Sequence, residues 1–216
     1  MRIISNTAIS LDGRISTRDA GHIALGSEED RRRMSLIRAD ADATLVGGNT
    51  FRNWSIPLLP RPGDSGRDYA KAPILNVIVS RQMDFELTPR FLNETGIKPL
   101  FLTNSQADLK HFPAEVALCD REITPEWIVK ILSDRGVKKL LIEGGGDLIT
   151  QFVAAGLLNE MYVTICPLLI GGSGTPLFFK GEGFGCDKAP RLKLLSHETV
   201  SDEVFLHYEL AKKTHY

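Results

Sequence analysis

The fold of this chain is decided by the stretch Lys138-Lys139-Leu140-Leu141-Ile142-Glu143-Gly144-Gly145-Gly146-Asp147-Leu148-Ile149. Its apolar run predicts a buried strand, and the three glycines predict a tight corner that opens into a helix. Glycines let a backbone approach an anion, and the N–H groups at a helix start favour phosphate. Asp147 places a like charge there unless it caps the helix. Because Ile149 replaces the third glycine of G-x-G-x-x-G, the stretch by itself fits a phosphate site and a plain structural corner equally well.

A second corner of the same kind occurs at Leu45-Val46-Gly47-Gly48-Asn49-Thr50. Here too an apolar strand meets glycines and a hydroxyl residue before a short helix. Two such corners in one α/β domain suit a ligand with two phosphate groups, such as a dinucleotide. Each corner alone is a weak signal, and together they favour nucleotide binding.

Strands and helices are expected to alternate outward from these corners. Apolar, β-branched runs predict strands at Arg2–Ile9, Ala43–Val46, Ile74–Val79, Leu100–Thr103, Glu115–Leu118, Lys139–Ile142, Met161–Cys166, Arg191–Val200 and Val204–Leu210. A capping box at Ser27–Asp30 predicts a helix to Ala39, Thr124-Pro125 opens a second that stops at Gly136, and a third covers Asp147–Ala155 before Gly156. We therefore expect an α/β fold with a mixed, mostly parallel sheet flanked by helices and a C-terminal antiparallel hairpin.

Composition limits the possible functions. The 216 residues carry a net charge of −1 with 43% apolar residues, which predicts one globular domain over 1–216 and argues against nucleic acid or an anionic membrane as partner. The N-terminus is too polar for a signal peptide, and no apolar run is long enough to span a membrane. Three cysteines without a C-x-x-C pair and five histidines without ligand spacing predict a cytoplasmic protein with no metal.

Several charged or polar residues stand where α/β folds bind ligands, at the ends of predicted strands or helices. Glu143 is either a ligand contact or a rim carboxylate, and we favour the first. Ser80-Arg81 suits a 2′-phosphate or is a solvated strand end. Arg38 and Arg61 suit a substrate phosphate, although the pattern alone favours ordinary surface arginines. The loop 57–73, rich in proline, is of a length that is usually functional or mobile.

Taken in order, these motifs resemble the reductase domain of riboflavin biosynthesis proteins, the C-terminal half of bacterial RibD and its single-domain counterparts. The matching segments are Ile9-Ser10-Leu11-Asp12-Gly13-Arg14, Leu36–Ala43, Gly47–Thr50, Leu141–Gly146, Phe152–Glu160 and Ile165–Gly172. The deaminase signature H-x-E…P-C-x-x-C of the bifunctional proteins does not occur in the sequence.

The resemblance implies a dihydrofolate-reductase-like fold, a homodimer, and NADPH-dependent hydride transfer to C1′ of 5-amino-6-(5-phosphoribosylamino)uracil. It implies cofactor contacts near Ala8 and Ile9, at Thr50 and Ser80, and along the corner from Gly145 to Gln151, which includes Gly146, Asp147 and Leu148. The residue patterns described above add Gly48, Arg81 and Gly144 as candidate cofactor contacts. It implies substrate contacts at Arg38, Leu58, Arg61 and Glu143. As a hypothesis, Glu143 or Asp12 relays the proton that opens the ribose.

Two segments depart from the family pattern. Trp54–Leu59 replaces Asp-Asp-Pro-x-Leu-Thr, and His22-Ile23-Ala24 replaces Ser-x-Trp. Both lie on the substrate and nicotinamide side in the family. Two alternatives therefore stay open: a reductase of another pterin or pyrimidine, and a non-catalytic nucleotide-binding protein.

Overall fold

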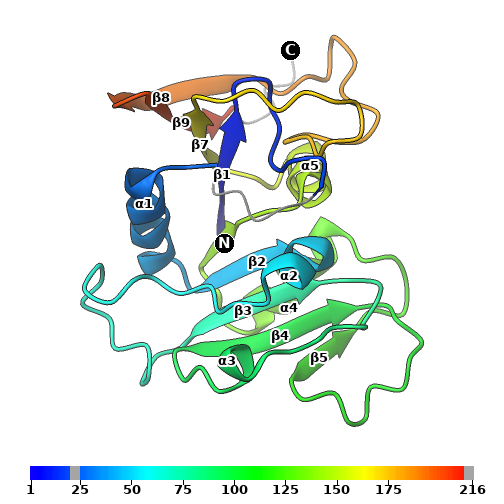
Figure 1. Cartoon of the computed structure of the whole chain (residues 1–216). Helices are drawn as coiled ribbons and strands as arrows, with labels where there is room; N and C mark the ends of the chain where they lie inside the picture. Colours follow the sequence, from blue (N-terminus) through cyan, green and yellow to red (C-terminus); the bar gives the residue numbers. More distant parts are fainter. Residues whose placement is uncertain (20–24, 212–216) are drawn as a thin grey trace.

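A single nine-stranded sheet organises the molecule (Figure 1), and the computed structural model describes residues 1–19 and 25–211. Its order is β5-β4-β3-β2-β6-β1-β7-β9-β8. The strands are β1 (Arg2–Ser10), β2 (Ala43–Gly47), β3 (Ile74–Val79), β4 (Ile97–Thr103), β5 (Glu115–Leu118), β6 (Lys139–Ile142), β7 (Glu160–Cys166), β8 (Leu192–Val200) and β9 (Glu203–Leu210).

Every pair of neighbouring strands from β5 to β7 is parallel, and the pairs β7–β9 and β9–β8 are antiparallel. The predicted mixed sheet and C-terminal hairpin are thus confirmed. In the parallel part the carboxyl ends of β2, β3 and β6 meet at one edge, because Leu45 pairs with both Ile142 and Val77. On the same side of the sheet β1 continues past Ser5, the partner of Ile142, to Ser10.

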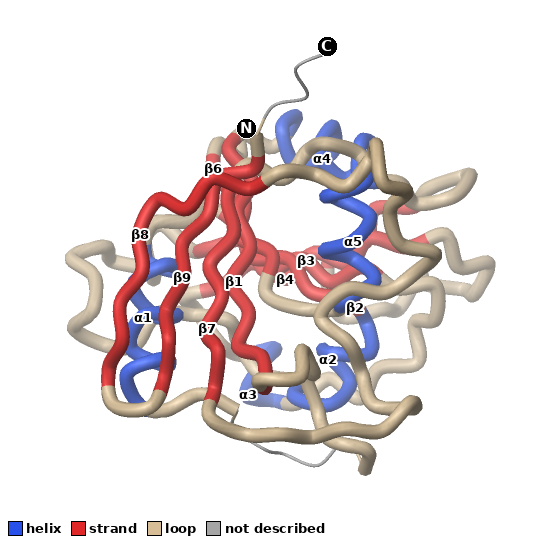
Figure 2. Tube along the Cα trace, turned by 90° about the horizontal axis from the view of Figure 1, so that it is seen from above, coloured by secondary structure: helices blue, strands red, loops and turns tan. Residues whose placement is uncertain are grey.

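Five helices cover the described part of the sheet: α1 (Glu28–Ala39), α2 (Gly48–Trp54), α3 (Pro89–Leu92), α4 (Pro125–Asp134) and α5 (Gly146–Ala154). Residues of α4 and α5 belong to one buried apolar cluster, while α1, α2 and α3 pack on a second cluster that contains Ile4 and Phe101. Figure 2 shows β8, β9, β7 and β1 side by side, and Figure 1 shows α1 and α5 on opposite sides of β1. The sheet therefore has a separate core on each face. The helix α3 was not predicted.

The start of α1 differs from the predicted capping box. Ser27 caps the helix as expected, because its hydroxyl accepts from the backbone N–H of Glu29 and Asp30. In a capping box the third helical residue would bond back to the Ser27 N–H, but Glu203 of β9 accepts that bond at 2.7 Å. The Asp30 side chain is buried against the sheet instead. Tertiary contact has replaced the local one.

The start of α5 also differs in detail. Its N-cap is Gly145, whereas Asp147 lies inside the first turn and pairs with Lys180 at 3.5 Å. Asp147 is thus not the cap that the sequence left open as a possibility. Its charge is partly balanced by the neighbouring lysine.

We expect Phe101→Ala to destabilise the protein by about 3–5 kcal/mol, because it removes a fully buried ring. The Phe101 ring packs edge-on or tilted against those of Phe51, Phe85 and Phe112. Urea unfolding followed by circular dichroism measures the loss. The control Leu118→Ala changes a side chain that is 62% exposed and should stay within about 0.5 kcal/mol of the parent. Equal losses in the two variants would contradict this account of the core.

Candidate active site at the carboxyl edge of the sheet

The two glycine corners lie against each other. They follow β6 and β2, which are hydrogen-bonded neighbours. A Cβ built on Gly145 would lie 3.9 Å from the Cα of Gly47, and one on Gly144 would lie 3.3 Å from Cγ2 of Thr50. The sheet therefore brings together the two predicted phosphate sites, which are almost 100 residues apart in the sequence.

Each of the three glycines in the β6–α5 corner occupies a position that disfavours any side chain. Gly144 and Gly145 have φ angles of 152° and 87°, in the region that side chains disfavour. A Cβ on Gly146 would collide with the main-chain carbonyl of Leu177 and lie 2.9 Å from that of Phe178. No side chain caps the start of α5 among the described residues. Its first N–H groups therefore suit an anion, as predicted for this corner.

The β2–α2 corner continues to the end of β3. A Cβ on Gly48 would lie 2.7 Å from Cβ of Ser80, so this corner requires glycine. The buried Ser80 hydroxyl donates to the carbonyl of Gln82 at 2.6 Å. Arg52, at the end of α2, donates to Ser80 Oγ at 3.3 Å and to Asp84 at 2.7 Å. Arg52 was not among the residues predicted from the sequence; the signal that could have found it is its position on α2, four residues after Gly48.

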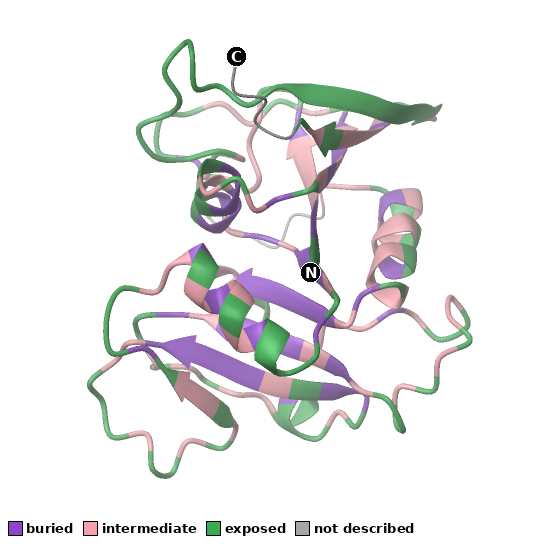
Figure 3. Ribbon diagram, turned by 180° about the vertical axis from the view of Figure 1, so that it is seen from behind, coloured by how far each residue is buried: buried purple, intermediate pink, exposed green. Residues whose placement is uncertain are grey.

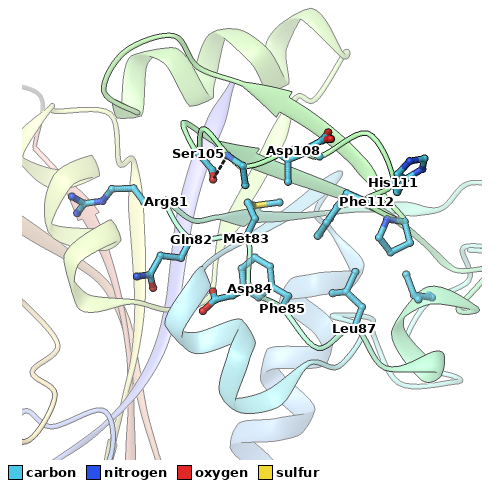
Figure 4. Close-up of a pocket in the computed structure, with 14 residues that line it drawn as sticks. Arg81, Gln82, Met83, Asp84, Phe85, Leu87, Ser105, Asp108, His111 and Phe112 are labelled. Atoms are coloured by element: carbon cyan, nitrogen blue, oxygen red, sulfur yellow. Dashed lines mark hydrogen bonds between the residues drawn. The ribbon is translucent and has the colours of Figure 1, made fainter.

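Arg81 is exposed and stands at one end of a cleft of about 830 Å³. The cleft lies between the segments that follow β3 and β4, and Met83, Phe85 and Phe112 supply apolar walls. In Figure 4 the Arg81 side chain extends to one side, away from these apolar residues. The cleft begins next to Ser80 and thus continues the line of the two glycine corners.

At three of the predicted cofactor residues, Ala8, Ile9 and Leu148, the main chain is the part that could meet a ligand. Ala8 and Ile9 lie at the end of β1, where they pair with Thr164 and Ile165 of β7. The Ile9 and Leu148 side chains pack with the apolar core on the α5 face. A ligand at this edge would therefore meet the main chain of Leu148, since its side chain points into the core.

Arg38 and Glu143 form a buried, two-pronged ion pair. Arg38 Nε donates to Oε1 at 2.7 Å and Nη2 to Oε2 at 2.5 Å, and the two side chains are 11% and 5% exposed. A third donor, Nη1, reaches the Leu59 carbonyl at 3.2 Å. The structure thus joins two predicted substrate residues. Both Glu143 oxygens are occupied by the guanidinium.

Leu58 and Arg61 lie in the long loop after α2, which is fixed by its main chain. The Leu58 N–H donates to Oδ1 of Asn76 at 2.7 Å, and the Arg61 N–H donates to Oγ of Ser35 at 2.7 Å. The Arg61 guanidinium pairs with Glu28 at the start of α1 and is 40% exposed. Arg61 therefore lies near α1, although its guanidinium does not join the Arg38–Glu143 pair.

Asp12 anchors a loop. Its carboxylate accepts from the Ser10 hydroxyl at 2.7 Å, from the Ile170 N–H at 3.1 Å and from the Gly171 N–H at 2.7 Å. These hydrogen bonds, led by that of Ser10, lower the pKa of Asp12 to about 2. An acid that stays ionised at neutral pH is a poor proton donor. The relay role of Asp12 stays a prediction that this geometry does not support.

Three further features complete the picture of the described residues. No group of three or more histidine, cysteine or acidic side chains with metal-binding geometry occurs among them. No helix in this part of the chain has the length and apolar character to cross a membrane. The segment His22-Ile23-Ala24, which departs from the family pattern, lies outside the residues that the structure describes.

Comparison with known proteins identifies the family. The family model described as RibD C-terminal domain matches residues 1–206. The chain is 29% identical over 192 residues to an Archaeoglobus fulgidus protein named 2,5-diamino-6-ribosylamino-4(3H)-pyrimidinone 5′-phosphate reductase, covering 84% of this chain and 87% of that protein. A Methanothermobacter thermautotrophicus protein of the same name is 28% identical and covers 95% and 96% of the two chains.

Solved structures share the fold. Acinetobacter baumannii RibD superposes with a TM-score of 0.80 at 20% identity over 97% of this chain, which spans 58% of that protein. A pyrimidine reductase-like protein from Corynebacterium diphtheriae gives 0.79 at 22% identity, covering 98% and 92% of the two chains. These likenesses confirm the dihydrofolate-reductase-like fold that the sequence led us to expect. The chain belongs to the RibD C-terminal domain family, the reductases of riboflavin biosynthesis.

Proposed function

We propose that this protein uses NADPH to reduce the ribosyl group of a 6-(5-phosphoribosylamino)pyrimidine to ribityl. The uracil form is the substrate expected from the sequence, and the single-domain relatives are named for the 2,5-diamino form. The observation that carries the proposal is the contact between the two glycine corners, beside the uncapped start of α5. The arrangement offers a dinucleotide a backbone cradle next to the Arg38–Glu143 pair.

The residues present fit NADPH. A Cβ built on Gly47 would have no neighbour within 4 Å among the described residues, and no side chain there caps the start of α5, so the backbone of both corners is open to an anion. We assign the pyrophosphate to the backbone of Gly144–Leu148 with Thr50 nearby, and the 2′-phosphate to Ser80 and Arg81. When bound, NADPH supplies the hydride. Membership in this reductase family supports a nicotinamide cofactor. The cationic Arg81 at the end of β3 favours NADPH over NADH.

We assign the substrate to the space bounded by α1, the Leu58–Arg61 loop and the end of β6. Reduction at C1′ requires the ribosylamine to open: the C1′–O bond breaks, a proton is delivered to the ring oxygen, and the nitrogen lone pair forms a protonated imine that keeps its N–H. The hydride then reaches C1′ and leaves a ribitylamine. Arg61 offers a partly exposed cation for the phosphate. Arg38 holds Glu143 in place, so any proton relay through Glu143 requires the substrate to share that carboxylate.

A homodimer is the assembly that we propose, through β8. This strand is the free edge of the sheet, and eight of its nine residues are exposed. Figure 3 displays it as a continuous exposed band at the end of the sheet. Its Leu192, Leu194 and Leu195 are each over 40% exposed, and Phe184 lies nearby in the same apolar pocket as Leu192. A long apolar edge of this kind favours a protein partner.

We also propose that the chain is one cytoplasmic domain over 1–216 that acts on a small molecule, without a nucleic-acid or membrane partner. The near-neutral net charge supports this proposal. So does the single sheet that runs through the described residues.

The purified protein should oxidise NADPH when a phosphoribosylamino-pyrimidine is added, and Arg61→Ala should raise the substrate KM about 10-fold or more. The KM for NADPH should not change, because Arg61 lies on the α1 side, away from the glycine corners. Absorbance at 340 nm follows the reaction. Arg90→Ala, an exposed arginine on α3, serves as control. Absence of oxidation with either ring form would refute the proposed activity, and an unchanged KM would remove Arg61 from the site.

Arg81→Ala should weaken NADPH binding by about 10-fold while it leaves NADH binding nearly unchanged. A guanidinium beside a 2′-phosphate contributes a charge-assisted hydrogen bond that NADH cannot make. Fluorescence titration with both cofactors measures the ratio, with Lys110→Ala as a control for general loss of surface charge. Equal weakening for the two cofactors would exclude Arg81 as the 2′-phosphate contact.

The parent protein should sediment as a dimer, and Leu194→Lys should shift it toward the monomer. A charge at the centre of an apolar β8 contact leaves an unpaired ammonium group in the interface. Analytical ultracentrifugation at micromolar concentration measures this shift. A control, Lys188→Glu, changes an exposed charge outside β8 and should stay dimeric. A monomeric parent protein would disprove this assembly.

A further inference from the structure

Arg52, at the end of α2, is an arginine that neither the cofactor assignment nor the substrate assignment uses. Its Nη2 donates to Asp84 at 2.7 Å, to the Gln82 carbonyl at 2.9 Å and to Ser80 Oγ at 3.3 Å. Its Nε also donates to Asp84, at 3.2 Å, and the guanidinium carbon lies 4.7 Å from the centre of the Phe85 ring. One side chain of α2 therefore braces the whole turn that follows β3.

The residues of this turn face Arg52 alternately. The Ser80 hydroxyl, the Gln82 carbonyl and the Asp84 carboxylate meet the guanidinium. Arg81 is exposed, pairs with no other described residue and extends away from the apolar wall of the neighbouring cleft (Figure 4). The bracing by Arg52 therefore leaves the Arg81 guanidinium free for a ligand.

The Ser80 hydroxyl is not free in the same way. Its Oγ lies 2.6 Å from the Gln82 carbonyl oxygen, and because a carbonyl only accepts, the hydroxyl donates its single proton there. The Oγ accepts in turn from the Gln82 N–H at 3.2 Å. A doubly ionised phosphate also only accepts. Ser80 can therefore donate to a 2′-phosphate only if its hydroxyl turns away from the Gln82 carbonyl.

Arg52 is placed to make that turn inexpensive. A carbonyl that loses its donor costs free energy, which would oppose the turning of Ser80. The Gln82 carbonyl has two acceptor positions, and Arg52 Nη2 already occupies the second at 2.9 Å. When the Ser80 hydroxyl leaves, the carbonyl keeps a charged donor. The main chain of the turn can then stay where it is.

We propose that Arg52 is a positioning residue of the cofactor site, which holds the Gln82 carbonyl so that the Ser80 hydroxyl can turn to the 2′-phosphate of NADPH. This inference rests on the proposed function and adds to it a residue that does not touch the phosphate. Asp84 keeps the guanidinium on the turn. Its hydrogen bond with Arg52 lowers the pKa of the Asp84 carboxyl, so this partner stays ionised at neutral pH.

The helix α2 also connects this turn with the proposed pyrophosphate site. A Cβ on Gly144 would lie 3.3 Å from Cγ2 of Thr50, and one on Gly48 would lie 2.4 Å from Ser80 Oγ. The hydroxyl thus lies against the start of the helix that carries Arg52. NADH has no 2′-phosphate and does not require the Ser80 hydroxyl to turn. Its binding should therefore not depend on Arg52.

The test measures the dissociation constants of NADPH and NADH by fluorescence titration. The parent protein should bind NADPH more tightly than NADH. Arg52→Ala should weaken NADPH binding by about 10-fold, the usual effect of one hydrogen bond to a charged group, and change NADH binding by less than about 2-fold. Arg135→Ala is the matched control and should change neither value. Arg135 also holds a carboxylate and a main-chain carbonyl, at the end of α4.

Two further variants separate this role from a general loss of structure or charge. In a Ser80→Ala protein, the added Arg52→Ala change should weaken NADPH binding by less than about 2-fold, because the hydroxyl that Arg52 serves is absent. Arg52→Lys keeps the positive charge but lacks the fork that reaches Gln82 and Asp84 together. It should lose most of the preference for NADPH, and it keeps the inference testable if the alanine variant does not fold.

Equal weakening of both cofactors by Arg52→Ala, additive losses in the double variant, or full NADPH preference in Arg52→Lys would each overturn the role of Arg52. The proposed reductase would remain intact in these cases. A parent protein without preference for NADPH would overturn this role together with the 2′-phosphate assignment to Ser80 and Arg81. Binding of neither cofactor would overturn the proposed function as well.

Discussion

The site depends on one constraint, the hydrogen bonding of β6 between β1 and β2 in parallel register. Because Ile142 pairs with Ser5 on one side and Leu45 on the other, the chain leaves all three strands at the same edge. The two glycine corners can touch only in this arrangement. A slip of one residue along β6 would turn Glu143 to the other face, away from Arg38.

The helix α1 joins this edge to the hairpin side of the sheet. Its C-terminal end is fixed by the Arg38–Glu143 pair and its start by the bonds between Ser27 and Glu203. Removing one partner of a buried ion pair leaves an uncompensated charge, at a cost of about 3–5 kcal/mol. Arg38 and Glu143, which line the proposed substrate site, therefore also hold α1 on the sheet. Binding and stability are linked at this point.

The two faces of the site have different chemistry. On the α5 side it consists of backbone N–H groups, glycines and the cationic end of β3, which suits an anionic cofactor. On the α1 side it consists of carboxylates and arginines, which suits a polar ring that carries a phosphate. Bound as proposed, a hydride donor and an acceptor would be held by separate elements.

The sequence by itself determined the order of the strands along the chain, the starts of α1 and α4, and the two glycine corners. These features depend on local patterning, because period-two apolar runs, capping hydroxyls and paired glycines act within a few residues. Strand and helix ends marked Arg38 and Glu143 as candidates, and the family resemblance assigned both to the substrate. Local patterns also predicted a capping box at Ser27. The serine caps the helix as predicted, but Asp30 does not accept the Ser27 N–H.

Only the tertiary structure decided which residues meet. The corners after β2 and β6, the Arg38–Glu143 pair and the contact of Asp30 with Thr164 join segments about 100 or more residues apart. No local pattern encodes such contacts, because they depend on which strands become neighbours in the folded sheet. For the same reason the sequence around Ser27 could not show that Glu203, at the start of β9, accepts the Ser27 N–H that a capping box would give to Asp30.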